Sequence, residues 1–88
     1  MNQEEQQDKI SYEQFIQLSQ EDQDQLIYKY GVLIAEKKEE MYDVYLWQLW
    51  SFYAEVFQKK DFSYIEKISV HNNDEILDQY IDNIKIDL

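Results

Sequence analysis

The hydrophobic positions of this chain concentrate in residues 41–57, where thirteen of seventeen side chains are apolar or aromatic. Apolar and polar positions alternate along much of this stretch, and such alternation is typical of β-strands. Aromatic and β-branched residues also favour strands over helices. The pattern therefore predicts two strands, over residues 42–48 and 52–58, joined near Trp50 and Ser51.

The same alternation divides the side chains of these strands between the two faces of a sheet. One set is assigned to the core and consists of Tyr42, Val44, Leu46, Phe52, Ala54 and Val56. The other set is the candidate interface, because exposed aromatic side chains on a small protein indicate a binding surface. It consists of Tyr45, Trp47, Tyr53 and Phe57. Glu55 falls on the face opposite Phe52, where we expect it to contact solvent. The alternatives are that the helices and the tail cover the aromatic set, and that Glu55 faces the interior.

A buried helix over residues 41–57 is the competing interpretation. No Gly, Pro, Asn or Asp marks a turn between the two predicted strands. Four apolar positions also recur at the spacing of one helix face, namely Leu46, Trp50, Tyr53 and Phe57. This alternative would make the protein an all-α small helical bundle.

Two short helices are predicted before the aromatic stretch. Ser11 and Gln14 have the spacing of a capping box, in which each side chain satisfies a free backbone donor at the helix start. Ser19 repeats the cap, and the acidic residues that follow it oppose the helix dipole. The second helix should run over residues 20–30 and end at Gly31, the single glycine, placed where a left-handed residue commonly ends a helix. Its inward side chains should be Leu26, Ile27 and Tyr30.

Three further elements complete the pattern. Residues 32–35 form a short apolar run suited to a strand, and residues 62–70 predict another strand, in which the phases of Ile65 and Ile68 indicate a bulge. A last helix should begin at Asn72 and Asn73. Its apolar stripe contains Ile76, Leu77, Tyr80, Ile81 and Ile84.

The order of these elements predicts an α+β fold. It contains two short N-terminal helices, a three- to four-stranded antiparallel meander and one C-terminal helix, with the helices placed most simply on one face of the sheet. Residues 1–9 are polar and without periodicity, and we expect a disordered or frayed tail there. Residues 10–88 are expected to form a single domain.

The charge of the chain narrows the classes of partner. The net charge is −11, and the sequence contains no arginine. Direct nucleic-acid binding and binding to an anionic membrane are therefore not expected, whereas a basic partner protein is compatible with this charge. Asp74, Asp78 and Asp82 lie four residues apart on the predicted last helix and form a candidate acidic stripe. Such a row could imitate a nucleic-acid backbone and occupy a basic surface.

The sequence contains no recognisable catalytic pattern. His71 is the single histidine and there is no cysteine, so a metal site would need carboxylates for its other ligands, which is uncommon. The serines lack a nucleophile-elbow motif, and one glycine cannot make a glycine-rich phosphate loop. We therefore predict no catalytic, metal-binding or cofactor-binding residues, and no enzyme. The absence of cysteine, of a signal peptide and of a long apolar run predicts a cytoplasmic location.

A resemblance adds to this interpretation. The chain resembles a group of small uncharacterised bacterial proteins over approximately residues 11–84. The positions that carry the resemblance are residues 12–19, Gly31, residues 46–49, residues 52–56, Ile65 and Ile68. Ala54 stands where that group usually has valine. The resemblance implies the α+β fold and strands in the central stretch. It implies no activity.

These observations predict a small acidic protein that acts as a non-enzymatic protein–protein interaction module. Its partner would be another protein, or a second copy of the chain in a homodimer. One alternative is an acidic inhibitor, or nucleic-acid mimic, that occupies a basic surface of a partner. A second alternative is a small carboxylate-based enzyme with a pocket that contains Glu55 or His71.

Overall fold

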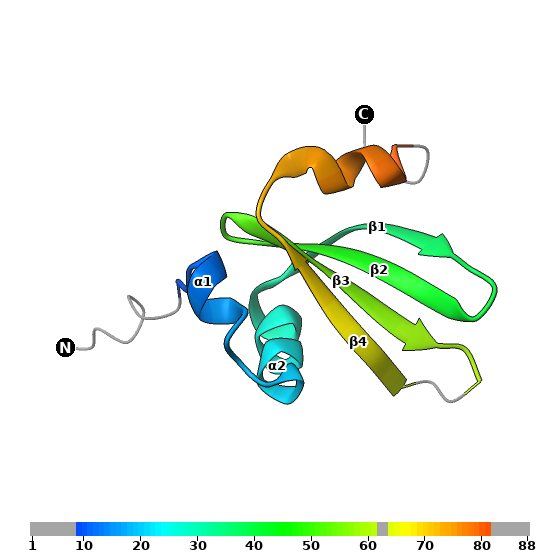
Figure 1. The fold of residues 1–88 in the computed structure, drawn as a ribbon, viewed down its shortest axis with the longest axis horizontal. Coiled ribbons are helices and arrows are strands. Elements are labelled where there is room, and N and C mark those ends of the chain that lie inside the picture. Colours follow the sequence, from blue (N-terminus) through cyan, green and yellow to red (C-terminus); the bar gives the residue numbers. More distant parts are fainter. Residues whose placement is uncertain (1–8, 62–63, 82–88) are drawn as a thin grey trace.

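The computed structural model describes residues 9–61 and 64–81. Figure 1 shows four strands side by side in chain order, with two short helices before them and a 3₁₀-helix after them. The elements are α1 (Tyr12–Phe15), α2 (Gln20–Tyr30), β1 (Val32–Lys38), β2 (Tyr42–Leu49), β3 (Phe52–Lys59), β4 (Tyr64–His71) and η2 (Asp74–Tyr80). The predicted α+β fold is confirmed. Residues 1–8 of the predicted tail lie outside the described residues.

The sheet is an antiparallel meander with the strand order β1-β2-β3-β4. β2 and β3 pair without interruption from Tyr42 opposite Lys59 to Leu49 opposite Phe52. The helical alternative for residues 41–57, and with it the all-α bundle, is therefore wrong. The bulge predicted near Ile65 is confirmed, because the pairing of β3 with β4 shifts between Phe57 and Gln58, which lies opposite Ile65.

The tight turn between β2 and β3 forms at Trp50 and Ser51 without Gly, Pro, Asn or Asp. Trp50 takes a positive φ of 39°, a conformation that costs a non-glycine residue roughly 1–3 kcal/mol. Its ring packs at centroid distances of 5.4 Å from Tyr30 and 6.1 Å from Phe52. These contacts offset the backbone cost, which is why a turn exists where the sequence shows no turn signal.

Both N-terminal helices begin at the predicted caps. The Ser11 hydroxyl accepts from the Gln14 backbone N–H at 3.1 Å, and the Gln14 side chain accepts from the Ser11 backbone N–H at 2.9 Å. The Ser19 hydroxyl accepts from the Asp22 backbone N–H at 3.1 Å. The buried Gln23 side chain then donates to the Phe15 carbonyl at 2.9 Å and ties the two helices together.

Gly31 ends α2, but not in the left-handed conformation that we predicted. Its φ of −78° and ψ of 156° are extended, a conformation open to any residue. Glycine is required there by a close approach instead. A Cβ atom on Gly31 would lie 2.6 Å from the Ile27 carbonyl oxygen and 3.1 Å from the Trp47 ring.

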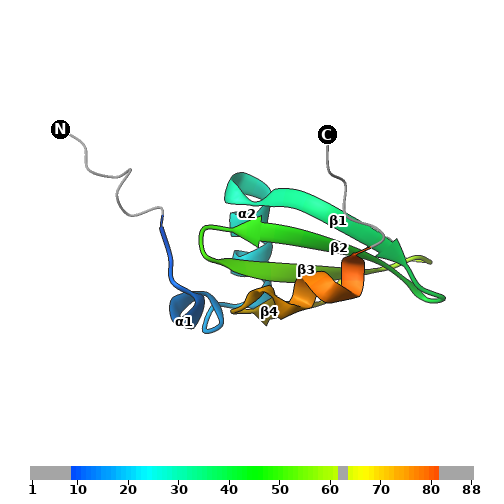
Figure 2. The same ribbon diagram turned by 90° about the horizontal axis from the view of Figure 1, so that it is seen from above.

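The helices cover both faces of the sheet, so the prediction that they share one face is wrong. Figure 2 shows α2 behind the strands and η2 in front of them. The core beneath α1 and α2 consists of Phe15, Ile27, Leu49, Phe52, Ala54 and Val56. The core beneath η2 consists of Ala35, Val44, Leu46, Tyr53, Ile76 and Tyr80.

The register of β2 and β3 is the physical reason for two cores. Residues that face each other across antiparallel strands point to the same side of the sheet. Trp47 lies opposite Ala54, and Leu46 lies opposite Glu55. The predicted core residues of β2 therefore lie on the η2 face, and those of β3 lie on the α2 face. Each face carries apolar side chains that need a cover.

The C-terminal element begins where the sequence predicts, but it is a 3₁₀-helix over its described length. The Asn73 side chain accepts from the Glu75 backbone N–H at 2.9 Å and caps it. Ile76 and Tyr80 are buried against the sheet, as the apolar stripe predicts, but Ile81 of the same stripe is exposed. Ile84, the last residue of that stripe, lies outside the described residues.

Candidate functional site

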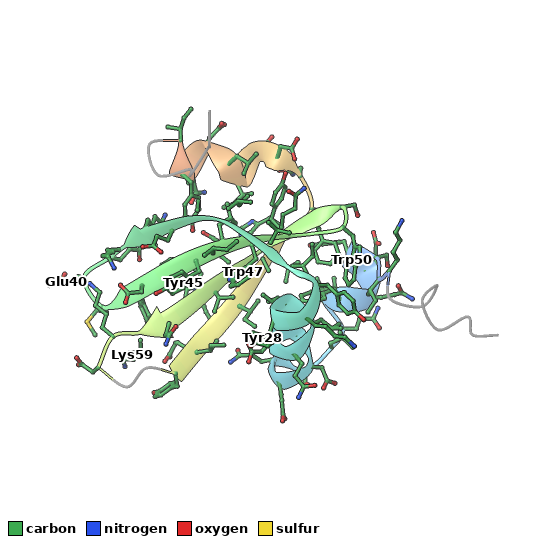
Figure 3. All side chains as sticks on the ribbon, turned by 180° about the vertical axis from the view of Figure 1, so that it is seen from behind. Tyr28, Glu40, Tyr45, Trp47, Trp50 and Lys59 are labelled. Atoms are coloured by element: carbon green, nitrogen blue, oxygen red, sulfur yellow. The ribbon has the colours of Figure 1, made fainter. Side chains whose placement is uncertain are left out.

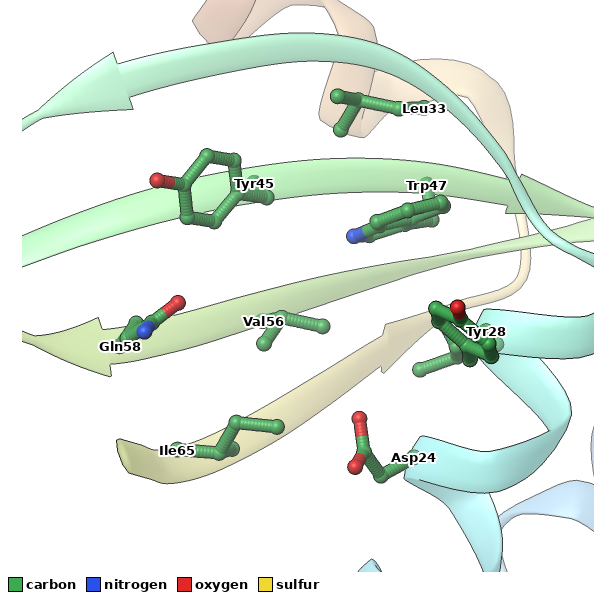
Figure 4. Close-up of a pocket in the computed structure, with 9 residues that line it drawn as sticks. Asp24, Tyr28, Leu33, Tyr45, Trp47, Val56, Gln58 and Ile65 are labelled. Carbon is green, nitrogen blue, oxygen red and sulfur yellow. The ribbon is translucent and has the colours of Figure 1, made fainter. Parts of the chain in front are cut away.

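An apolar groove lies between α2 and the sheet. Its volume is about 280 Å³, and four strands and one helix contribute to its lining. The residues that line it are Asp24, Ile27, Tyr28, Leu33, Tyr45, Trp47, Val56, Gln58 and Ile65. In Figure 4, Val56 lies on the sheet in the middle of this group, with Tyr45 and Trp47 on one side of it, Ile65 on the other, and Asp24 and Tyr28 on the helix. We call this site the aromatic groove.

The groove is open because α2 covers only one end of the strands. Figure 3 shows α2 beside Trp47, whereas Tyr45 lies on a part of the sheet that the helix does not reach. Tyr28 is 87% exposed at the rim, and Leu33 is 42% exposed. Two large side chains thus meet water beside a cavity whose floor is apolar. Exposed apolar groups that gather around a depression are typical of binding sites.

Only part of the predicted aromatic interface lies in this groove. Tyr45 and Trp47 line it, but Tyr53 and Phe57 lie on the opposite face of the sheet. Tyr53 is buried, and its hydroxyl donates to the Asp74 carboxylate at 3.0 Å. Phe57 is half-buried and packs edge-on against Tyr42 at a centroid distance of 6.0 Å. The four residues therefore do not form one surface.

The groove contains residues that sequence reasoning missed, among them Asp24, Tyr28 and Leu33. A signal for Tyr28 exists in the sequence, because it is an aromatic residue of α2 outside the set predicted to point inward. Asp24 and Leu33 carry no such signal, since an acidic residue on a helix and a leucine in a strand are both ordinary.

A second candidate site lies on the η2 face, around Glu55. This carboxylate is only 5% exposed, so the prediction that it contacts solvent is wrong. Its face was predicted correctly, but η2 covers that face. His71 Nε2 lies 2.8 Å from Glu55 Oε1, and the Tyr80 hydroxyl donates to Glu55 Oε2 at 2.5 Å. Burial, and then the hydrogen bond and charge of Glu55, raise the pKa of Tyr80 above its usual range.

His71 connects this buried pair to the surface. It lines a polar depression of about 680 Å³ together with residues of η2 and of the turn before it, including Asn72, Asn73, Glu75 and Asp78. When Glu55 is ionised it can only accept, so Nε2 of His71 carries the proton in their hydrogen bond. In the neutral imidazole, Nδ1 is then the acceptor nitrogen. A carboxylate that orients a histidine in this way is a recurring device of general-base chemistry.

The candidate acidic stripe does not form a regular row over the described residues. A 3₁₀-helix has three residues per turn, so positions four apart, such as Asp74 and Asp78, point in different directions. Asp74 also accepts the hydrogen bond of Tyr53. Asp82, the third member of the stripe, lies outside the described residues.

The described residues carry neither a metal site nor a membrane-spanning helix. No group of three or more His, Asp or Glu side chains within residues 9–61 and 64–81 is arranged to hold a metal ion. In the same ranges, every helix is too short or too polar to cross a bilayer.

Fold and sites together define a small α+β meander protein with an open aromatic groove on one face and a buried polar network on the other. Comparisons with protein-family models, with curated proteins and with solved structures found no match. The resemblance to small bacterial proteins therefore stays a prediction.

Proposed function

We propose that this protein is a non-enzymatic interaction module that binds a partner protein through the aromatic groove. The observation that carries the proposal is the position of Tyr28, Tyr45 and Trp47 around an apolar cavity that α2 leaves open. Aromatic side chains at the centre of an interface supply much of the binding energy, because they bury large areas at a small cost in conformational entropy.

The partner that suits this groove presents an apolar side chain next to a basic one. The cavity is mostly apolar, but Asp24 lies in its wall, and Glu21 and Asp22 are exposed on the same helix. The whole chain carries a net charge of −11. A basic flank on the partner would gain from this charge during encounter and in the complex. A second copy of the chain would bring the same negative charge and is disfavoured as the occupant.

Selection of peptides from a random displayed library tests the proposal. We expect the selected peptides to combine an apolar or aromatic residue with Lys or Arg. Their affinity should fall by about tenfold for Tyr28→Ser and for Trp47→Ser, the scale of an interface hot spot. Ile16→Ser is the matched control, because Ile16 is an exposed apolar residue outside the groove. Selected peptides that bind Tyr28→Ser and Trp47→Ser as tightly as wild type would refute the groove as the binding site.

The oligomeric state provides an independent test. We expect a monomer in sedimentation at micromolar concentration, with no difference between wild type and Trp47→Ser. A wild-type dimer that Trp47→Ser dissociates would assign the groove to a second copy of the chain instead of a basic partner.

The hydrogen-bonded Glu55–His71 pair favours a second candidate function, a small enzyme that uses general-base chemistry in the polar depression. Its test is hydrolysis of a panel of simple esters by the wild type and by His71→Gln. Turnover that is absent from His71→Gln, while the fold is retained, would support an enzyme. Equal rates in the two proteins would remove this candidate.

A further inference from the structure

Three aromatic rings and one carboxylate line the same small cavity of the aromatic groove. Tyr28 and Asp24 come from α2, one turn apart, and Tyr45 and Trp47 come from β2, two residues apart on one face. Figure 4 shows the Asp24 carboxylate directed away from the helix toward the sheet. The face of an aromatic ring attracts a cation, tryptophan most strongly, and a nearby carboxylate adds a counter-charge.

Three rings elsewhere in the molecule have a cation of the chain's own. Lys29 Nζ lies 5.2 Å from the ring centroid of Tyr30, Lys37 Nζ lies 4.7 Å from that of Tyr80, and Lys67 Nζ lies 4.7 Å from that of Phe57. In the part of the chain that the structure describes, no lysine lies over Tyr28, Tyr45 or Trp47. Asp24 likewise forms no ion pair or hydrogen bond with the described residues.

Building on the proposed function, we infer that the aromatic groove is a subsite for an arginine side chain of the partner protein. A guanidinium group is planar and weakly hydrated, so it stacks on an aromatic ring at a lower desolvation cost than the ammonium of lysine. Its parallel N–H donors also match the two oxygens of a carboxylate such as Asp24. The cavity of about 280 Å³ is a site for one side chain and not for a folded segment.

The composition of the chain identifies the source of this arginine. The sequence contains eight lysines and no arginine. A second copy of the chain therefore cannot supply the guanidinium, and the occupant must come from a different protein.

A titration with a minimal probe tests this subsite. The probe is N-acetyl-arginine amide, and the matched neutral probe is N-acetyl-citrulline amide, which has a similar shape and no charge. The readout is the NMR signal of the Trp47 indole N–H in the labelled full chain. We expect the arginine probe to shift this signal, and to bind about tenfold more tightly than the citrulline probe. The Trp50 indole signal should not move.

Two variants keep the test independent of folding. Asp24→Asn removes the counter-charge at an exposed position and should weaken arginine binding several-fold. Glu13→Gln removes another exposed acid, on α1, and should leave arginine binding unchanged. Equal binding of arginine and citrulline, or unchanged binding by Asp24→Asn, would overturn the arginine subsite.

The outcome separates this inference from the proposed function. Selected peptides that lack arginine but still require Trp47 would refute the arginine subsite and leave the interaction module standing. If no selected peptide depends on the groove residues for binding, the proposed interaction module is refuted, whether or not the arginine probe binds.

Discussion

The two faces of the sheet differ in whether their acidic side chains have hydrogen-bond partners. On the η2 face, Glu55 is buried and both of its oxygens have hydrogen-bond partners, one on β4 and one on η2. On the α2 face, Asp24 lies beside an apolar cavity and has no described partner. A buried charge must be paired, because leaving it unpaired costs several kcal/mol. The η2 face is therefore a closed face, whose paired polar groups contribute to stability. The α2 face is an open face, on which Asp24 has no partner among the described residues.

The same difference applies to aromatic residues. Tyr80 is fully buried and holds η2 on the sheet, whereas Tyr28 is 87% exposed. A large residue with no exposed surface contributes strongly to the free energy of folding. A large residue that is exposed beside a cavity contributes little to that free energy. Substitutions on the two faces should accordingly separate stability from binding.

The largest expected effect is on the closed face. Tyr80→Ala removes a fully buried ring and leaves Glu55 Oε2 without a donor, so we expect a loss of about 3–5 kcal/mol in the free energy of unfolding. Urea denaturation measures it. Tyr80→Phe keeps the ring and should cost only about 1–3 kcal/mol. A loss of the same size in both variants would mean that packing of the ring contributes little.

Gly31→Ala should affect both stability and the groove, because its Cβ would meet the end of α2 and the Trp47 ring. Its φ is suitable for alanine, so the substitution would ordinarily stabilise by about 0.4–1 kcal/mol. The clash with the Ile27 carbonyl and the Trp47 ring reverses the sign, and we expect a loss of about 1–3 kcal/mol. Urea denaturation gives the size, and the Trp47 indole NMR signal should move. A Gly31→Ala variant more stable than wild type would show that the end of α2 can move to accommodate the added Cβ atom.

The stability of the protein at high pH should depend on the buried hydroxyl of Tyr80. The pKa of Tyr80 is raised in the folded state, so the folded protein binds this proton more tightly than the unfolded chain. Its contribution is present below about pH 10, the ordinary value for tyrosine, and is lost as the pH rises beyond it. We expect stability to fall by about 1.4 kcal/mol more per pH unit above pH 10 in wild type than in Tyr80→Phe. Parallel pH profiles for the two proteins would contradict the role of Tyr80.

The smallest expected effect on stability is on the open face. Tyr28→Ser should change the free energy of unfolding by less than about 0.5 kcal/mol, because the side chain is mostly in water. Ile16→Ser, at another exposed apolar position, is the matched control for stability. The two variants should differ in peptide binding, which only Tyr28→Ser should weaken. A destabilisation by Tyr28→Ser similar to that by Tyr80→Phe would erase the distinction between the faces.

The strands and the helix caps could be predicted from the sequence because their signals are local. The alternation in residues 42–58 and the serine caps at Ser11 and Ser19 each depend on a few neighbouring residues. The division of side chains between faces needed one more step. A two-residue turn at Trp50 and Ser51 places Leu49 opposite Phe52, and that pairing alone puts Tyr45 and Trp47 on the face of Ala54 and Val56.

The two candidate sites could not be predicted in the same way, because they depend on contacts between distant elements. The burial of Glu55 depends on Tyr80, which lies twenty-five residues further along the chain. The openness of the groove depends on how far α2 extends over the strands. Neither quantity has a signal in the periodicity of any single element.

Irregular pairing of both edge strands has a consequence for self-association. β1 and β4 each have one neighbour in the sheet, so each presents an edge on which another strand could add. The pairing of β1 is interrupted between Leu33 and Ala35, and that of β4 is interrupted beside Gln58. An irregular edge with charged residues, such as Lys38 on β1 and Lys67 on β4, is a poor template for a growing sheet. We therefore expect these edges to resist the addition of further strands.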